Sequence, residues 1–215
     1  MRRLIATLAA SMLLLSACAD GTGTSSPVGM DPDGRSELLP EVPPQVLDLR
    51  DRRRMDLDQL KAAIAVVSAG RTWVDPNNGR DLFDDLAATL GKPDYAQTTT
   101  EDLSVSPLFM KFLGDAARQI CDRMAEEERT MDATERVLYP LVAADDSLLS
   151  NHDAVLQNLS QLLLLYHGRA LPADSAELNP WEWLFESATF VTNDPVKGWR
   201  TVCVGLISHP DFYTY

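Results

Sequence analysis

The sequence predicts an all-α protein, a compact irregular bundle of five to seven helices that follows a signal peptide and a flexible tether. Three observations favour this fold. From residue 47 onward apolar residues recur at spacings of three and four, no segment alternates apolar and polar residues as a strand would, and prolines and glycines separate the periodic segments. The repeats of helical solenoids are absent from the sequence, so a bundle is expected instead.

The first two helices are predicted from apolar spacing and from residues that begin or end helices. Residues 56–69 form the first helix, because Asp56 is a capping residue and Gly70 is a stop signal. A turn cluster at 75–79 precedes a short second helix that ends at Gly91. The apolar faces of these two helices contain Leu57, Leu60, Ile64, Val67, Leu82, Phe83, Leu86 and Leu90.

The remaining helices include the two strongest patterns in the chain. The third helix begins at Ser106-Pro107, since proline is favoured in a first turn, and Glu126-Glu127-Glu128 are expected to form a solvated face at its end. Residues 153–167 are the most apolar segment and are expected to lie centrally, after a cap within 150–153. The last two helices are expected at 180–189 and after Pro195.

Composition limits the classes of partner. The chain has 215 residues, of which 45% are hydrophobic and 24% are charged, which predicts one globular domain and excludes a disordered or collagen-like chain. Its 19 Lys and Arg residues against 32 Asp and Glu residues give a formal net charge of -13, which repels nucleic acid and anionic headgroups. We therefore expect no nucleic-acid partner, and membrane attachment must come from a lipid.

The first 17 residues have the pattern of a bacterial signal peptide. Two arginines precede an apolar run over residues 4–15 that is too short to cross a bilayer as a helix. The run ends in Leu15-Ser16-Ala17-Cys18, which resembles the lipobox of bacterial lipoproteins. An ordinary secretory signal that is cut near Ala17, with an incidental cysteine, is the alternative.

The lipobox resemblance implies a lipid anchor in the bacterial cell envelope. Diacylglycerol on the thiol of Cys18 and a further acyl chain such as palmitate would hold the protein on a membrane, since each buried methylene contributes about 0.8 kcal/mol. Ala19 stands where some inner-membrane lipoproteins have Asp, so the outer membrane is favoured. Residues 18–46 are rich in Gly, Ser, Thr, Pro and Asp and are interpreted as a tether, and residues 47–215 as a single helical domain.

The cysteine count predicts a disulfide. Lipidation of Cys18 leaves Cys121 and Cys203, which both lie on apolar faces of expected helices and therefore face the core. Outside the cytoplasm a close pair of thiols oxidises. We predict a disulfide between Cys121 and Cys203, and two separate buried thiols are the alternative.

No motif identifies a reaction, so no catalytic residue, cofactor site or metal site is assigned. The three histidines have no Cys or His partner at metal-ligand spacing, and they are His152, His167 and His209. His167 ends the most apolar helix, where a cation would meet the negative end of the helix dipole, and a metal or haem ligand is the alternative.

Two glutamates and two tryptophans form the strongest candidate for a pocket. Glu182 and Glu186 are spaced i, i+4 beside Trp181 and Trp183, so the two carboxylates share one helical face. Two glutamates on an amphipathic helix are more commonly its solvated side.

A second resemblance covers about 55 residues near the end of the chain. The segments LLLLYHGRALPADSAEL (162–178) and GWRTVCVGLISHPDFYTY (198–215) resemble the C-terminal helical part of uncharacterised domains found beside c-type cytochromes in planctomycetes and myxobacteria. Asp211 stands where those domains have Glu, and the haem-binding motif of the cytochrome modules is absent from the sequence. The resemblance implies a helical envelope protein beside a respiratory or surface multiprotein system, and it implies no catalytic residue.

The expected function is that of an acidic, envelope-anchored lipoprotein that serves as a non-enzymatic accessory or binding subunit of another envelope protein. The aromatic end of the chain either packs on the core or forms an exposed partner patch of Phe212, Tyr213 and Tyr215. The alternative function is an enzyme or cofactor-binding protein with a pocket near Trp181, Glu182, Glu186 and His167. A structural lipoprotein without a specific ligand is a third hypothesis.

Overall fold

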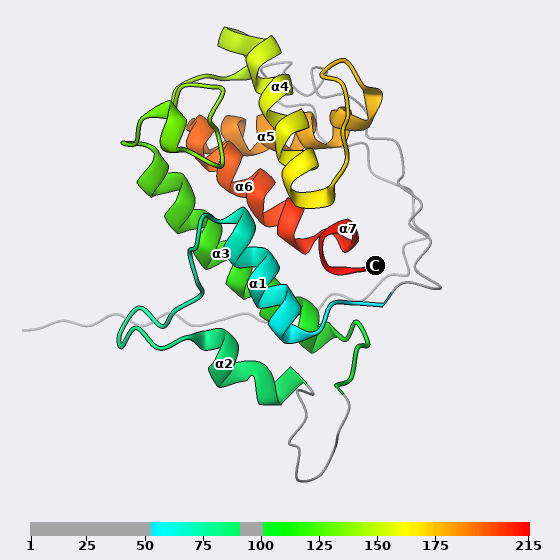
Figure 1. Cartoon of the computed structure of the whole chain (residues 1–215). Helices are drawn as coiled ribbons and strands as arrows, with labels where there is room; N and C mark the ends of the chain where they lie inside the picture. Colours follow the sequence, from blue (N-terminus) through cyan, green and yellow to red (C-terminus); the bar gives the residue numbers. More distant parts are fainter. Residues whose placement is uncertain (1–52, 91–100) are drawn as a thin grey trace, which may run out of the picture. The chain divides into compact units, whose positions relative to one another are not determined.

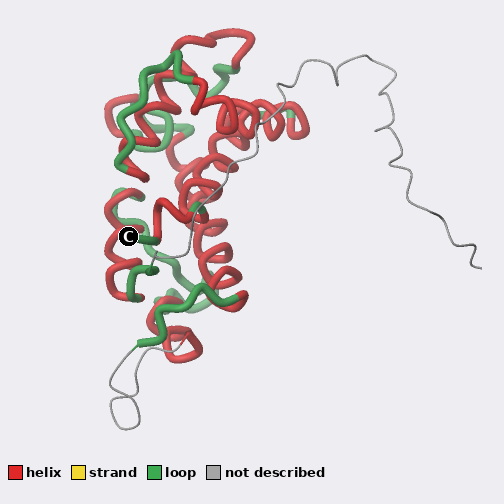
Figure 2. The backbone as a smooth tube through the Cα atoms, turned by 90° about the vertical axis from the view of Figure 1, so that its right-hand side faces the viewer, coloured by secondary structure: helices red, strands yellow, loops and turns green. Residues whose placement is uncertain are grey.

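The computed structural model describes residues 53–90 and 101–215, and these residues confirm the all-α prediction (Figure 1). Figure 2 shows them as helices and loops, without a strand. The described residues form seven α-helices, which are α1 (Leu57–Val67), α2 (Leu82–Ala87), α3 (Pro107–Glu128), α4 (Leu148–His167), α5 (Asn179–Thr192), α6 (Pro195–Ser208) and α7 (Pro210–Tyr213). Among the described helices, none combines the length and apolar character needed to span a membrane. The signal peptide, the lipobox with Cys18 and residues 18–46 lie outside the described residues.

Most helix starts agree with the predicted caps, because the capping side chains bind the free backbone N–H groups. The carboxylate of Asp56 accepts a hydrogen bond from the N–H of Gln59 at 2.7 Å. Asp81, which is not among the predicted caps, caps α2 in the same way. The hydroxyl of Ser106 accepts the N–H of Phe109 at 3.1 Å at the start of α3.

The regular part of α4 follows a break at Asn151, close to the predicted start at 153, but the helical turn that precedes the break was not predicted. The helix begins at Leu148, because Ser147 and Ser150 form a capping box that closes an additional turn. Asn151 then leaves helical geometry, with φ -152°, and separates this turn from the rest of α4. The cap expected within 150–153 therefore lies at Ser147. The other end of α4 closes with Gly168 in the left-handed region at φ 66°, a conformation that glycine adopts without strain.

Helix α6 is the centre of the core, because it packs against both α3 and α5 (Figure 1). Its inward face is fully buried and includes Trp199, Val202 and Cys203. Cys203 forms a disulfide with Cys121 of α3, with an S–S distance of 2.00 Å and a Cα–Cα distance of 5.8 Å. The predicted disulfide is thereby confirmed in the structure, and it joins two helices that are 82 residues apart in sequence.

Two glycines let α5 approach α6 closely. A Cβ atom added at Gly198 would lie 2.3 Å from Oγ1 of Thr189 and 2.9 Å from the ring of Phe185. One added at Gly205 would lie 3.0 Å from Leu184. Because these neighbours are buried or partly buried in α5, the space that a side chain would need is already filled.

The beginning of α1 and the C-terminus are held together by a short antiparallel bridge. The N–H of Met55 donates to the carbonyl of Tyr213 at 2.7 Å, and the N–H of Tyr215 donates to the carbonyl of Arg53 at 3.0 Å. Between them Arg54 is buried, at 1% exposure. Its guanidinium donates to the carboxylate of Glu101 at 2.9 Å, so the charge has a partner in the protein interior.

The close approach of α5 and α6 predicts that Gly198→Ala lowers the free energy of unfolding by about 1–3 kcal/mol, because the added methyl overlaps Thr189 and Phe185. The matched control is Gly114→Ala on α3, where the nearest atoms belong to the flexible side chain of Arg118 at 3.4 Å. That change should leave stability unchanged or raise it by up to about 1 kcal/mol. Urea unfolding followed by circular dichroism measures both, and equal effects would contradict the packing account.

Candidate functional site

The structure divides the residues of the predicted acidic aromatic pocket between two places. The ring of Trp181 lies 5.6 Å from that of His167, centroid to centroid, at the C-terminal end of α4. Glu182 instead faces His152 near the start of α4, with Oε1 3.4 Å from Nε2. Residues 152 and 167 are separated by about 22 Å along the helix at 1.5 Å per residue. Trp181 and Glu182 thus reach toward opposite ends of α4.

The glutamate end is an acidic surface with one histidine. Glu186 and Glu182 are both partly exposed, and His152 also lies 3.5 Å from the carboxylate of Asp153. Burial and the negative charge of Glu182 raise the pKa of the Glu186 carboxyl above its ordinary value. Glu182, Glu186 and Asp153 therefore form a cluster of carboxylates around the imidazole of His152.

The other end gathers three rings and a carboxylate where α4 and α6 both finish. His167 stacks on His209 with a centroid distance of 4.8 Å and an interplanar angle of 29°. Trp181 packs beside both, 5.8 Å from the ring of His209. Asp211 is two residues beyond His209, and one ligand atom from each of His167, His209 and Asp211 lies within 4.8 Å of the other two.

Hydrogen bonds assign the ring protons in this cluster. Nε2 of His167 lies 3.0 Å from the carbonyl oxygen of Leu206, and since a carbonyl only accepts, Nε2 carries the proton. Nδ1 of the same ring is buried and has no hydrogen-bond partner among the described residues. Nδ1 of His209 accepts the N–H of Asp211 at 3.1 Å and thereby caps α7. Burial lowers the pKa of the His167 imidazole from its ordinary value.

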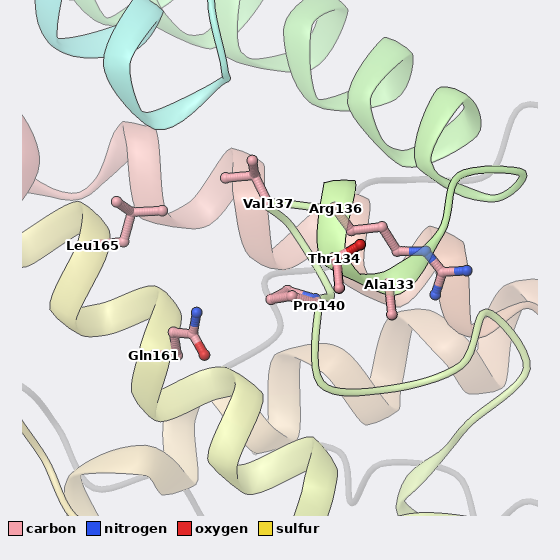
Figure 3. Close-up of a pocket in the computed structure, with 7 residues that line it drawn as sticks. All are labelled: Ala133, Thr134, Arg136, Val137, Pro140, Gln161 and Leu165. Carbon is pink, nitrogen blue, oxygen red and sulfur yellow. The ribbon is translucent and has the colours of Figure 1, made fainter.

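A separate pocket of about 410 Å³ lies between α4 and the loop that follows α3 (Figure 3). It is lined by Ala133, Thr134, Arg136, Val137, Pro140, Gln161 and Leu165. The guanidinium of Arg136 donates to the carbonyls of Met131 and Val142, so this charge is committed to holding the loop. The pocket therefore combines apolar side chains with the polar groups of Thr134 and Gln161 and one guanidinium, that of Arg136.

The prediction of a solvated glutamate face at the end of α3 is wrong for one of the three residues. Glu126 and Glu127 are exposed, whereas Glu128 is fully buried. Its carboxylate accepts the N–H of Leu138 at 2.8 Å and anchors the loop that follows α3. Burial raises the pKa of Glu128 above 4.5, and burial together with the charge of Glu128 raises the pKa of Tyr139 to about 12.

The aromatic end of the chain packs on the core, so the three residues do not form the exposed patch. Phe212 and Tyr213 are buried. The ring centroid of Phe212 lies 6.0 Å from that of Tyr166, and the ring centroid of Tyr213 lies 5.4 Å from that of Phe109. Tyr215 alone of the three is exposed, at 68%.

Comparisons of the chain with protein-family models, with curated proteins and with solved structures found no match. The resemblances to bacterial lipoproteins and to the cytochrome-associated domains therefore stay predictions from the sequence.

The cluster of His167, His209 and Asp211 was not predicted from the sequence, because its members are distant in the chain. His167 ends α4, and His209 follows 42 residues later, after α5 and α6. The neighbours His209 and Asp211, spaced i, i+2, were the one local signal that could have indicated it.

Burial of Glu128 predicts a pH dependence of stability. Since the folded-state pKa is raised, the ionised carboxylate destabilises the fold as pH rises from 4.5 through that pKa. Glu128→Gln keeps an oxygen acceptor for Leu138 but cannot ionise. Its free energy of unfolding, relative to the wild type, should therefore increase with pH in urea titrations between about pH 3 and pH 8.

Glu126→Gln is the matched control with the opposite sign. The ammonium of Lys197 lowers the pKa of Glu126, so the wild-type residue stabilises the fold above 4.5 and loses this effect as pH falls through the lowered pKa. Relative to the wild type, this variant should become less stable as pH rises. Parallel pH profiles for the two variants would contradict the assignment.

Proposed function

We propose that the protein is a lipid-anchored envelope protein whose helical domain serves as a non-enzymatic accessory or binding subunit of another envelope protein. The anchor is Cys18, the tether is residues 18–46, and the outer membrane is the favoured location. The observation that carries the export step is the disulfide between Cys121 and Cys203, because such bonds persist in oxidising compartments and are rare in the cytosol.

A binding role is supported by the surface around the pocket. Leu164 and Leu165 of α4 are 53% and 41% exposed, and Leu141 of the adjoining loop is 45% exposed. Exposed apolar side chains beside a pocket are typical of surfaces that contact another protein. A net charge of -13 disfavours nucleic acid and anionic lipid headgroups as the occupant, and a protein surface is the partner that we propose.

The alternative of an enzyme or cofactor-binding protein rested on one shared pocket. That hypothesis requires the two glutamates to lie beside His167, and the structure places Glu182 at the other end of α4 beside His152. The structure thus does not join the glutamates and His167 in one pocket, and the accessory role is the function that we propose.

The anchor is tested by Cys18→Ala, which removes the thiol that takes the lipid. In cells fed an alkyne-labelled palmitate, the wild type should carry the label and sediment with membranes, and this variant should lose both properties. The matched control is the double variant Cys121→Ala/Cys203→Ala, which keeps Cys18 and should stay labelled. A membrane-bound, unlabelled Cys18→Ala protein would contradict the proposal of a lipid anchor.

The partner is tested by placing a photo-crosslinking amino acid at Leu164 and, as the control, at the exposed Lys111 of α3. Irradiation of intact cells, followed by mass spectrometry, should give one dominant envelope protein from the Leu164 variant and none from the Lys111 variant. Equal crosslinking from both positions would contradict a specific partner at this surface.

A further inference from the structure

We propose that His167, His209 and Asp211 form a binding site for a divalent transition-metal ion of the zinc class. Two imidazoles and one carboxylate are a zinc ligand set that leaves the fourth position open for water or for an exogenous ligand. The three residues come together where α4 and α6 end, with one ligand atom from each within 4.8 Å of the others. This inference is independent of the anchor and of the partner.

His167 is prepared as a ligand by its contact with Leu206. Nε2–H donates to the Leu206 carbonyl, so the lone pair of the neutral ring is on Nδ1. Nδ1 is buried and has no other hydrogen-bond partner among the described residues, which is costly for a polar atom unless something binds it. Metal-bound histidines typically donate their second ring N–H to a carbonyl or carboxylate in this way.

His209 and Asp211 supply the second and third ligands from one turn of chain. Nδ1 of His209 already carries a lone pair, since it accepts the N–H of Asp211, and it lies 3.7 Å from Oδ2 of the same residue. In a tetrahedral zinc site with bonds of about 2.0–2.1 Å, ligand atoms are about 3.3 Å apart, so closure requires shifts of up to about 1.5 Å. Binding through Nδ1 would replace the hydrogen bond that caps α7.

The electrostatic surroundings favour a cation, with one opposing group. The carbonyl ends of α4 and α6 both point to the cluster, and each contributes a partial negative charge of about half an elementary charge. Arg169 opposes the metal, because Nη1 lies 4.0 Å from Oδ2 of Asp211. The same guanidinium also pairs with Glu177, which gives it a second place to bind. A metal ion would compete with Arg169 for the carboxylate.

The test is calorimetric titration of Zn²⁺ into the full lipidated protein in detergent, without a polyhistidine tag. One ion should bind per chain. Three variants each remove one ligand and keep the local contact: His167→Gln retains a donor for the Leu206 carbonyl, His209→Asn retains a helix cap, and Asp211→Asn retains the side-chain shape. Each should weaken Zn²⁺ binding at least about tenfold. His152→Gln, at the other end of α4, is the matched control and should bind as the wild type does.

Two further measurements keep the test decisive. Co²⁺ should quench the fluorescence of Trp181, and Trp181→Phe should lose most of this quenching while its binding stoichiometry stays at one. If a ligand variant fails to fold, as judged by its melting temperature without metal, Arg169→Gln replaces it and should bind Zn²⁺ more tightly. The proposal is overturned by the absence of saturable binding, by equal weakening in His152→Gln, or by unchanged affinity in the folded ligand variants and in Arg169→Gln.

Discussion

The contact between α3 and α6 is the constraint on which the other packing depends, and the Cys121–Cys203 disulfide fixes it covalently. Closing a loop of this length lowers the conformational entropy of the unfolded chain, which stabilises the fold by about 4–5 kcal/mol in the chain-entropy model. Because α6 also packs against α5 and continues into the α7 turn, the position of α6 determines where the histidine cluster forms and where the C-terminus meets the start of α1. One crossing of two helices thus organises segments from both ends of the domain.

The sequence predicted the elements well, because the signals for helices are local. The caps at Asp56 and Ser106 and the apolar spacing of α3 and α6 each depend on residues within a few positions. The cysteines could be paired because two remained once Cys18 was assigned to the lipobox resemblance. The missed turn at the start of α4 is a local failure, since Ser147 and Ser150 form its capping box, whereas the other failures are non-local. Glu128 looked solvated because its partner, the backbone of the loop at 137–139, is set by tertiary packing.

Packing between distant segments also explains why the predicted acidic aromatic pocket is divided between two places. Glu182 and Glu186 share a helical face, but neighbouring side chains on α5 reach toward opposite ends of α4, and helical spacing alone does not show this. The cluster of His167, His209 and Asp211 arises where two helices end, and the chain between them is long. The packed domain therefore presents two separate features, an apolar surface on α4 beside the pocket and a polar cluster at the helix ends, and a binding subunit can use both.

The account depends most directly on the disulfide, and peptide mapping of the protein purified from the cells that make it tests this bond. Denatured, unreduced protein is treated with an alkylating reagent, digested and examined by mass spectrometry. The predicted result is one linked pair of peptides that contain Cys121 and Cys203, with no alkylation of either residue. Alkylated Cys121 and Cys203 in separate peptides would contradict the disulfide that fixes the contact between α3 and α6, and would remove the observation that supports the proposed export.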